Sequence, residues 1–341
     1  METIVSITGP TASGKSHVAL SLAQALNAEI VNADSIQVYK YFDIGSAKPT
    51  ADELKKVPHH LISILEPEEE FQAGRFIELA DQAIADILWR KKSAFVVGGT
   101  GLYIKALLHG LAPVSEVNCT THERLKAIEQ DISQSYPATE FKAKLHERLA
   151  QFDPRAAAEL KVADISRIRR ALTVFLATGR SVKDFQEEHK FKDARYRALN
   201  IIVTLPREEL YGRIDTRVDQ MLALDWIDEV ENLMPDYEES KPMKSIGYKQ
   251  IVRYINREIA REEMIELIKQ DTRHYAKRQL TWWRNEPRKL GWQSLDALWA
   301  EHCRGHESDN LTGRLSSFVN FYLQSAPGFE APGVSYLLLT S

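Results

Sequence analysis

The stretch Thr3–Ser16 reads TIVSITGPTASGKS, an alternating β-branched run that enters a glycine-rich loop ending in lysine and serine. The loop matches GxxxxGK[ST], and His17–Ala25 continues with the apolar spacing of a helix. Backbone N–H groups of such a loop converge on phosphate oxygens, and the helix N-terminus adds a favourable dipole. The segment therefore predicts a pyrophosphate-binding P-loop, with Lys15 on the terminal phosphate and the Ser16 hydroxyl as a ligand of a Mg²⁺ cofactor. The residues expected to hold the diphosphate are Gly9, Pro10, Thr11, Ala12, Ser13, Gly14, Lys15 and Ser16.

Strand-like and helical segments alternate through the first hundred residues. Glu29–Asn32 is expected to be a second short strand, and Phe76–Lys91 has the spacing of an amphipathic helix. That helix leads into the buried-strand run Ala94–Val97 and the glycine turn that follows it. This alternation predicts an α/β fold, a P-loop NTPase-like parallel sheet flanked by helices.

The pattern changes in the middle of the chain. Between His122 and Glu188 we expect helices only, interrupted at Pro137, at Asp153–Pro154 and at Gly179, before a strand returns at Asn200–Leu205. We therefore predict a catalytic core with C-terminal helices over 1–112 and 199–324, and a helical insertion over 113–198. Residues 325–341 form a tail, poorly ordered or strand-like, to which we assign no function.

Composition limits the class of protein. The 341 residues carry a net charge of −4, which argues against indiscriminate nucleic-acid binding, although basic residues cluster over 161–197 and 241–289. Two distant cysteines make a disulfide framework improbable, so we expect a reducing, cytoplasmic location. Since no apolar run approaches the roughly 20 residues of a membrane span, no membrane partner is expected. Nothing in the sequence signals an oligomer, and we expect a monomer.

Asp34 follows the strand Glu29–Asn32, which places its carboxylate at the edge of the sheet where ligands bind in open α/β folds. An acid there can take a proton from an acceptor nucleophile. The alternative is structural, because Asp34 can also cap a helical turn that starts at Ser35.

Several strings, in order between Ile4 and Trp292, resemble the tRNA dimethylallyltransferase family, also called tRNA isopentenylpyrophosphate transferases. One string alone is weak, whereas the ordered set is specific. The strings are GPTASGKS (9–16), DSIQVY (34–39), DIGSAKPT (43–50), VPHHL (57–61), VGGTGLY (97–103), DPR (153–155) with SRIRRALTVF (166–175), LYGRIDTRVDQM (210–221), SIGYKQ (245–250) and TRHYAKRQLTW (272–282).

The resemblance implies that the P-loop holds dimethylallyl diphosphate. The implied acceptor is the exocyclic N6 amine of the adenine 3′ of the anticodon, in tRNAs that read codons beginning with U, and diphosphate is released. Asp34 fits the general base, while Lys15 and Arg217 fit stabilisation of the leaving diphosphate. Thr100 fits an orienting hydrogen bond, and the Gln37 amide suits the edge of a flipped adenine.

The resemblance also implies that the insertion and the C-terminal helices hold the anticodon stem-loop. Arg167 and Arg170 are expected to face solvent or phosphate, and Tyr248 and Trp282 to stack on splayed bases. Since Trp282 and Trp283 are adjacent, at most one of them can face RNA, and the other is expected to belong to the core. The expected tRNA-binding residues are Asp34, Ser35, Ile36, Gln37, Thr100, Arg124, Ser166, Arg167, Ile168, Arg169, Arg170, Lys244, Ser245, Ile246, Gly247, Tyr248, Lys249, Arg273, Lys277 and Arg278.

Some residues have plainer explanations. The glycines of VGGTGLY can simply make a tight turn, His59 and His60 are expected to be packed or capping rather than metal ligands, and Arg213 has the spacing to pair with Glu209. The chain also departs from the family pattern. Ser16 and Ser46 replace threonines, Ala163 replaces asparagine, Asp225–Trp226 replaces Gly-Leu, and Arg124 is only approximately placed.

Three other functions remain open from sequence. A P-loop kinase of a small metabolite would use the basic insertion as a lid, but it leaves DIGSAKPT, SIGYKQ and TRHYAKRQLTW unexplained. An adenylate isopentenyltransferase would share the catalytic half, whereas the basic C-terminal helices favour tRNA. A non-enzymatic RNA-binding P-loop protein is disfavoured by the intact Lys15, Ser16, Asp34 and Thr100.

Overall fold

The computed structural model describes residues 1–112, 119–191, 193–305, 310–325 and 334–340. The chain divides into two compact units, Met1–Gly110 with Asp193–Ser341, and Leu111–Lys192. The second boundary differs from the expected one, because Arg197 already belongs to a strand of the first unit.

The first unit is built on a parallel sheet, as predicted. Among the described residues, seven strands pair in the order β3-β2-β4-β1-β5-β7-β6, and each pairing is parallel. Ile7 of the central strand is in register with Val97 on one side and Ile201 on the other. The strands are β1 (Thr3–Thr8), β2 (Ala28–Asn32), β3 (His59–His60), β4 (Ser93–Gly98), β5 (Arg197–Thr204), β6 (Gln293–Ser294) and β7 (Val334–Thr340).

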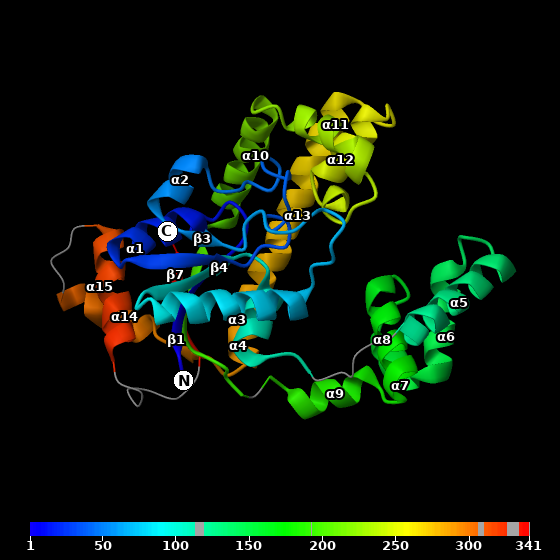
Figure 1. Ribbon diagram of the computed structural model, residues 1–341, viewed down its shortest axis with the longest axis horizontal. Helices are drawn as coiled ribbons and strands as arrows, with labels where there is room; N and C mark the ends of the chain where they lie inside the picture. The colour runs from blue at the N-terminus through cyan, green and yellow to red at the C-terminus, as the bar shows by residue number, and fades with distance from the viewer. Residues whose placement is uncertain (113–118, 192, 306–309, 326–333, 341) are drawn as a thin grey trace. The chain divides into compact units, whose positions relative to one another are not determined.

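Helices cover both faces of this sheet (Figure 1). Alternate residues of β1 point to opposite sides, so that Ile4 joins one hydrophobic cluster and Val5 the other. The Ile4 cluster contains side chains of α3, α4 and α10–α13, and the Val5 cluster contains those of α1 and α15. The helices of this unit are α1 (Lys15–Ala25), α2 (Ala51–Lys56), α3 (Ala73–Trp89), α4 (Gly101–His109), α10 (Arg207–Ala223), α11 (Trp226–Tyr237), α12 (Tyr248–Ile255), α13 (Arg261–Lys289), α14 (Asp296–Gly305) and α15 (Leu311–Gln324), with a 3₁₀ turn η1 (Pro242–Lys244).

The strand-like alternative for the tail is confirmed over Val334–Thr340, but this strand is part of the core, which corrects the expectation of a separate segment over 325–341. Val334–Thr340 forms β7 between β5 and β6, and its Leu337 is fully buried. Residues 326–333 and 341 lie outside the described part of the chain.

The second unit is helical where it is described, and its expected breaks are found. The Asp153 carboxylate accepts the Ala156 N–H at 2.9 Å and caps α7, which begins at Pro154. Gly179 ends α8 with a left-handed φ of 69°, a conformation that favours glycine. Ile168 and its neighbours give the unit its own hydrophobic cluster. The helices are α5 (Cys119–Ser135), α6 (Phe141–Phe152), α7 (Pro154–Glu159), α8 (Ile165–Thr178) and α9 (Val182–His189).

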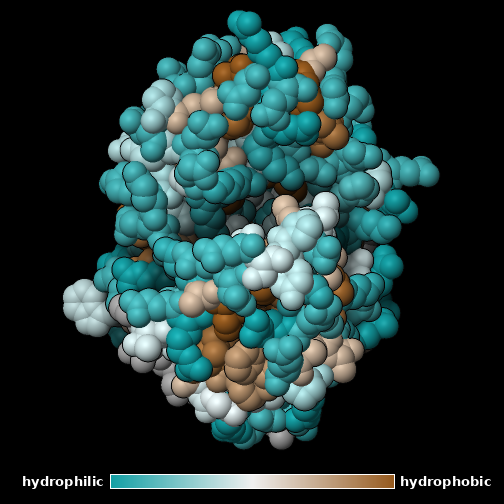
Figure 2. Space-filling model, turned by 90° about the vertical axis from the view of Figure 1, so that its right-hand side faces the viewer, coloured by the Kyte–Doolittle hydropathy of each residue, from teal (hydrophilic) through white to brown (hydrophobic). Residues whose placement is uncertain are grey.

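The surface seen in Figure 2 is mainly hydrophilic, and its hydrophobic side chains form small separate patches. Within the described residues, every helix is too short or too polar to cross a bilayer.

A buried carboxylate ties the edge of the sheet to the end of α3. Glu29 of β2 is 1% exposed and pairs with Arg90, with Lys92 at 2.9 Å and with His60 at 2.8 Å. Hydrogen bonding from Arg90 is the main cause that lowers the pKa of Glu29 from 4.5 to about 2, against the opposing effect of burial. Ionised Glu29 therefore stabilises the folded first unit.

Glu29→Gln should lower the free energy of unfolding at neutral pH by about 3 kcal/mol. Glutamine carries no charge, so the stabilisation that corresponds to the lowered pKa of Glu29 is lost. The stabilisation by Glu29 is complete above pH 4.5 and disappears as the pH falls through about 2. Urea unfolding at several pH values should show the two proteins converging in acid. Glu78, an exposed partner of Arg75, is the control. An equal loss in Glu78→Gln would contradict the special role of the buried site.

Candidate functional site

The loop over 9–16 joins β1 to α1 with the geometry predicted for a P-loop. Gly14 precedes α1 with a left-handed φ of 89°, and Gly9 has a φ of 148°. A Cβ on Gly9 would lie 2.2 Å from the carbonyl oxygen of Val203, so a side chain does not fit there. Lys15 and Ser16 are the first residues of α1, where free N–H groups favour an anion.

Lys15 and Arg217 form a cationic centre beside this loop. Burial and, to a smaller extent, the charge of Arg217 lower the pKa of Lys15 to about 8, whereas Asp34 opposes both effects. Burial also lowers the pKa of Arg217, again with Asp34 opposing. Two cations held together at this cost favour a bound anion, which would relieve their repulsion.

Two pockets adjoin at this centre. The first, here the P-loop pocket, has a volume of about 810 Å³ and includes Lys15, Ser16 and Arg217 in its lining. The second, here the Asp34 pocket, has a volume of about 380 Å³ and includes Asp34 and Arg217. Ala12 and Arg217 line both pockets. A ligand held at the P-loop would therefore lie next to one held beside Asp34.

Asp34 occupies the predicted position after β2, and its carboxylate also bonds the backbone of the turn that follows it. Its Oδ1 accepts the N–H groups of Ile36 at 2.8 Å and Gln37 at 3.3 Å. These bonds stabilise a turn, and no helix follows it. Both hydrogen bonds go to one oxygen of the carboxylate.

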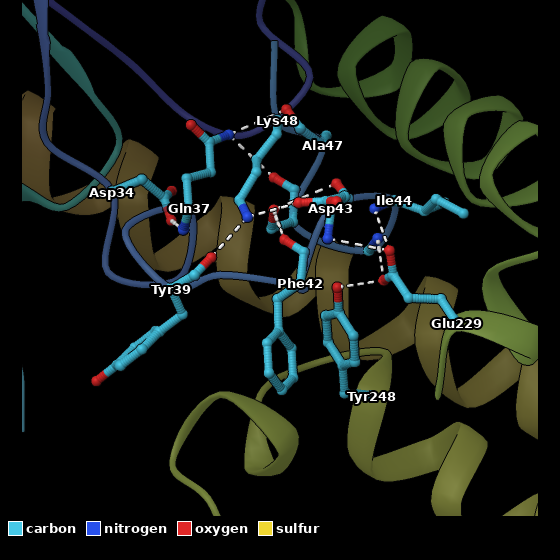
Figure 3. Close-up of polar contacts among 12 residues, drawn as sticks. Asp34, Gln37, Tyr39, Phe42, Asp43, Ile44, Ala47, Lys48, Glu229 and Tyr248 are labelled. Atoms are coloured by element: carbon cyan, nitrogen blue, oxygen red, sulfur yellow. Dashed lines mark hydrogen bonds and ion pairs between the residues drawn. The ribbon is translucent and has the colours of Figure 1, made fainter. Parts of the chain in front are cut away.

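Gln37 does not offer the donor expected for reading a base. Its Nε2 donates to the carbonyl oxygens of Ser46 and Ala47, each at 3.0 Å. Figure 3 shows the Gln37 amide directed at the loop that contains Ser46 and Ala47. The expectation is corrected to that extent, since both hydrogens of the amide group serve the protein's own backbone.

The same loop is held from the other side by Glu229 of α11 (Figure 3). The carboxylate accepts the N–H groups of Asp43, Ile44 and Gly45 at 3.0, 2.7 and 3.3 Å. The Tyr248 hydroxyl donates to it at 2.6 Å. Since Gly45 lines the Asp34 pocket, Glu229 positions one of its walls. Glu229 was not predicted from the sequence, since it stands outside the family strings.

Tyr248 corrects a second expectation. Its ring is fully buried, against Phe42 and Trp226, and cannot stack on an RNA base. Burial raises the pKa of the Tyr248 hydroxyl, and Glu229 adds to this effect. The Trp226 ring lies so close to Gly247 that a Cβ there would be 2.0 Å from it. Within 244–249, Lys244, Ser245 and Ile246 line the Asp34 pocket, while Lys249 pairs with Asp271 at 3.0 Å.

The chain's departure at Asp225–Trp226 has a local consequence. Asp225 has a left-handed φ of 64°, a conformation that glycine adopts more easily. Trp226 is 2% exposed and fills the space between Gly45 and Gly247. The turn therefore orients the indole that supports the wall of the Asp34 pocket.

Helix α13 contributes two residues to the candidate site, Tyr275 and Gln279, that were not predicted from the sequence. Tyr275 lines the Asp34 pocket, where burial and, to a smaller extent, the charge of Asp34 raise the pKa of its hydroxyl to about 12. Gln279 is 7% exposed and bonds the backbone at Thr11 and at Gly99. The spacing of Thr272, Tyr275 and Gln279 on one helical face is the signal that could have found them.

The glycine turn around Thr100 is shaped by close packing. A Cβ on Gly98 would lie 2.2 Å from the Ala33 carbonyl oxygen, and one on Gly101 would lie 2.2 Å from the Trp282 indole. The glycines therefore let other groups approach the backbone. Trp283 is 3% exposed and Trp282 is half-buried, which confirms that one of the adjacent tryptophans belongs to the core.

The basic residues of α13 differ in their surroundings. Arg273 pairs with Asp215 of α10 at 2.8 Å, so its expected phosphate contact would require breaking this ion pair. Lys277 and Arg278 are exposed and, with Trp282, line a groove of about 530 Å³.

In the second unit, Arg167 and Arg170 are exposed, as predicted, and so is Ser166. Ile168 is fully buried in that unit's core, which corrects its place among the RNA-binding residues. Arg169 pairs with Glu129, and Arg124 donates to the Leu176 carbonyl at 3.0 Å.

The residues for which a structural role was expected, Arg213, His59 and His60, contact other residues of the protein. Arg213 pairs with Glu209 at 2.8 Å, as its spacing predicted. His59 contacts the Val57 carbonyl oxygen, and His60 contacts Glu29, both at 2.8 Å.

Comparisons with known proteins agree with these motifs. A family model described as IPP transferase matches residues 37–286, and one described as isopentenyl transferase matches residues 2–66. A tRNA dimethylallyltransferase of Syntrophobacter fumaroxidans is 45% identical over 295 residues, covering 86% of this chain and 84% of the relative. One of Geobacter metallireducens is 44% identical over 321 residues, covering 94% and 97%.

Solved structures match as well. One described as a eukaryotic dimethylallyltransferase acting on tRNA has a TM-score of 0.70 and 29% identity, covering 83% of this chain and 70% of that one. A tRNA isopentenylpyrophosphate transferase of Staphylococcus epidermidis has a TM-score of 0.58 and 36% identity, covering 84% and 91%.

Proposed function

The chain belongs to the tRNA dimethylallyltransferase family, and from this membership we propose that it prenylates tRNA. The reaction moves a dimethylallyl group from dimethylallyl diphosphate to N6 of the adenine 3′ of the anticodon, in tRNAs that read codons beginning with U. The partner is the anticodon stem-loop, bound by a monomer. The observation that carries the proposal is that Ala12 and Arg217 line both pockets, so that donor and acceptor can meet there.

The P-loop pocket is suited to the diphosphate of the donor. Lys15 and Arg217 are partly buried cations whose pKa values are lowered, and a diphosphate would restore a favourable charge balance. Negative charge grows on the diphosphate as the bond from carbon to oxygen breaks. Cations already in place stabilise that charge without reorganisation.

The donor set is compatible with Mg²⁺. Ser16 places an exposed hydroxyl in the first turn of α1 and lines the P-loop pocket. Within the described residues, no three His, Cys, Asp or Glu side chains gather into a metal site. Mg²⁺ commonly binds through few protein ligands together with phosphate oxygens and water, so Ser16 would hold it with the diphosphate. When bound, the ion would neutralise charge on the leaving diphosphate.

The Asp34 pocket is suited to the acceptor. An adenine amine is a poor nucleophile, because its lone pair is delocalised into the ring. The N6–carbon bond forms as the carbon–oxygen bond of the donor breaks, the amine proton passes to the Asp34 carboxylate, and diphosphate leaves. Tyr275 of α13, which lines this pocket, and Thr100, which directly precedes α4, would orient the amine.

The test of this function is transfer from labelled dimethylallyl diphosphate to tRNA, to AMP or to no acceptor. We expect label in tRNA alone. Transfer to AMP alone would favour an adenylate isopentenyltransferase, and phosphate release from ATP coupled to a small acceptor would favour a kinase.

Removing the divalent cation with a chelator should stop prenyl transfer while leaving most of the tRNA affinity, because Ser16 lies at the diphosphate and not on the basic helices. Rate and binding are measured on the same sample, and added Mg²⁺ should restore the rate. Transfer that continues at the original rate in chelator would contradict the assignment of Ser16 as a metal ligand.

Replacing Arg167 and Arg170 together by alanine should weaken tRNA binding and make it less dependent on salt, because fewer counterions are released. Binding is measured across a range of salt concentrations. A double variant of Lys55 and Arg75, both exposed, is the control. Unchanged affinity and salt slope would show that Arg167 and Arg170 are ordinary surface residues.

A further inference from the structure

We propose that Gln279 is a positioning residue, whose side-chain amide sets the spacing between the P-loop and the turn that carries Thr100. The inference rests on the proposed function, because that spacing would align the diphosphate donor with the amine acceptor. Gln279 itself lines neither the P-loop pocket nor the Asp34 pocket.

The amide joins two loops that are far apart in sequence. Gln279 Oε1 accepts the N–H of Thr11 at 2.9 Å, and its Nε2 donates to the carbonyl oxygen of Gly99 at 2.9 Å. The loops follow β1 and β4, which are adjacent in the sheet with Thr8 opposite Gly98. One buried side chain of α13 therefore bridges the two loops of the site.

Close packing limits what can occupy this bridge. A Cβ on Gly99 would lie 2.4 Å from Gln279 Nε2 and 3.2 Å from the Gly9 carbonyl oxygen. The amide end is held by two hydrogen bonds, so it cannot move aside without losing them. Gly99 is thus the counterpart of Gln279, because only glycine admits the amide.

The bridge requires an acceptor at one end and a donor at the other. An amide supplies both, whereas an ionised carboxylate only accepts and a methionine offers neither in comparable strength. Thr11 lines the Asp34 pocket and Thr100 directly follows Gly99, so a shift of either loop changes the approach of the reacting atoms. Misplacement by about 1 Å can lower a rate by about 10²-fold.

The experiment is single-turnover prenyl transfer to tRNA at saturating substrates, with binding of both substrates measured separately. Gln279→Met should transfer about 10²-fold more slowly, because the loops are no longer linked. Affinities for tRNA and for dimethylallyl diphosphate should change little, since Gln279 lines neither pocket.

A second variant adds a readout that general destabilisation would not move. Gln279→Glu keeps the shape, and its carboxyl can donate to Gly99 only when protonated. The rate of Gln279→Glu relative to the wild type should therefore rise as the pH falls, while the relative rate of Gln279→Met stays flat. Gly99→Ala should cause a similar loss, and combining it with Gln279→Met should add little, because both break the same link.

Asn200→Leu is the matched control. Asn200 is a buried amide that accepts the hydroxyls of Ser6 at 3.0 Å and Thr8 at 2.9 Å, and it lines neither pocket. Its variant should lose stability like Gln279→Met and keep its transfer rate when folded.

The outcomes separate the inference from the proposed function. A wild-type protein that does not prenylate tRNA refutes the function. With an active wild type, a Gln279→Met rate equal to wild type overturns the inference alone. So does an equal rate loss in Asn200→Leu, or a loss confined to substrate affinity.

Discussion

Asp34→Asn should transfer the dimethylallyl group about 10²–10⁴-fold more slowly than the wild type, which corresponds to roughly 3–5 kcal/mol in the barrier. Asparagine keeps the Oδ1 that accepts the Ile36 and Gln37 N–H groups, so the turn is preserved. It cannot take up the amine proton. The measurement is single-turnover transfer at saturating tRNA and dimethylallyl diphosphate, beside the binding of each substrate.

Asp43→Asn is the control for this variant. Asp43 is a nearby carboxylate that accepts from Lys48 at 2.6 Å and lines neither pocket, so its variant should keep the wild-type rate. If Asp34→Asn also transfers at the wild-type rate, Asp34 is not the base. If substrate binding is lost while the chemistry is normal, Asp34 recognises the acceptor instead.

Lys15→Met should lower the transfer rate by about 10²–10³-fold, because a charge that stabilises the leaving diphosphate is removed from a partly buried site. Arg217 remains, so some stabilisation persists. Lys40→Met is the control, since Lys40 is a half-exposed partner of Glu66. A normal rate in Lys15→Met would show that the P-loop lysine does not act on the diphosphate.

Because the pKa of Lys15 is lowered, the affinity of this site for diphosphate should depend on pH near neutrality. The group has a pKa of about 8 in the free protein, so it is charged below that value and loses its proton above it. Affinity for the anionic diphosphate should therefore fall as the pH rises through about 8, and binding at higher pH should take up a proton. Lys15→Arg, which stays protonated, should remove this dependence. Calorimetry in buffers of different ionisation enthalpy measures the proton uptake.

Much of the fold was predictable because its signals are local. The strand, glycine loop and lysine of 3–16 lie in one short stretch, and β1, the P-loop and α1 follow it directly. The helix ends at Asp153–Pro154 and Gly179 were also predicted correctly, because a helix cap and a left-handed glycine depend only on neighbouring residues in the sequence.

The strand-like alternative for the tail was right, but its place inside the sheet was not predicted, for a physical reason. Val334–Thr340 is a short apolar run after glycine and proline, and nothing local shows whether a strand of this length has a partner. The sheet supplies one, since β7 pairs with β5 and β6. Parallel pairing of segments more than 130 residues apart is decided only when the whole sheet forms.

Within the site, the motifs identified the right region but not the direction of each side chain. Tyr248 and Gln37 lie in family strings and have the chemistry to contact a base. Tyr248 is buried against Phe42 and Trp226, and Gln37 donates both hydrogens of its amide to the backbone of Ser46 and Ala47. The residue type shows which contacts a side chain is able to make, whereas the residues packed around it in the fold determine which of them it makes.

The sequence by itself determined the P-loop, the parallel α/β architecture and, through its ordered strings, the family. It did so because phosphate binding and strand–helix alternation depend on residues close together in the chain. The tertiary structure decided that Arg217 stands where two pockets adjoin, that Glu229 holds the loop at Asp43–Gly45, and that Gln279 joins the P-loop to Gly99. These contacts link residues more than 170 positions apart, and only the packing of α10, α11 and α13 on the sheet brings them together.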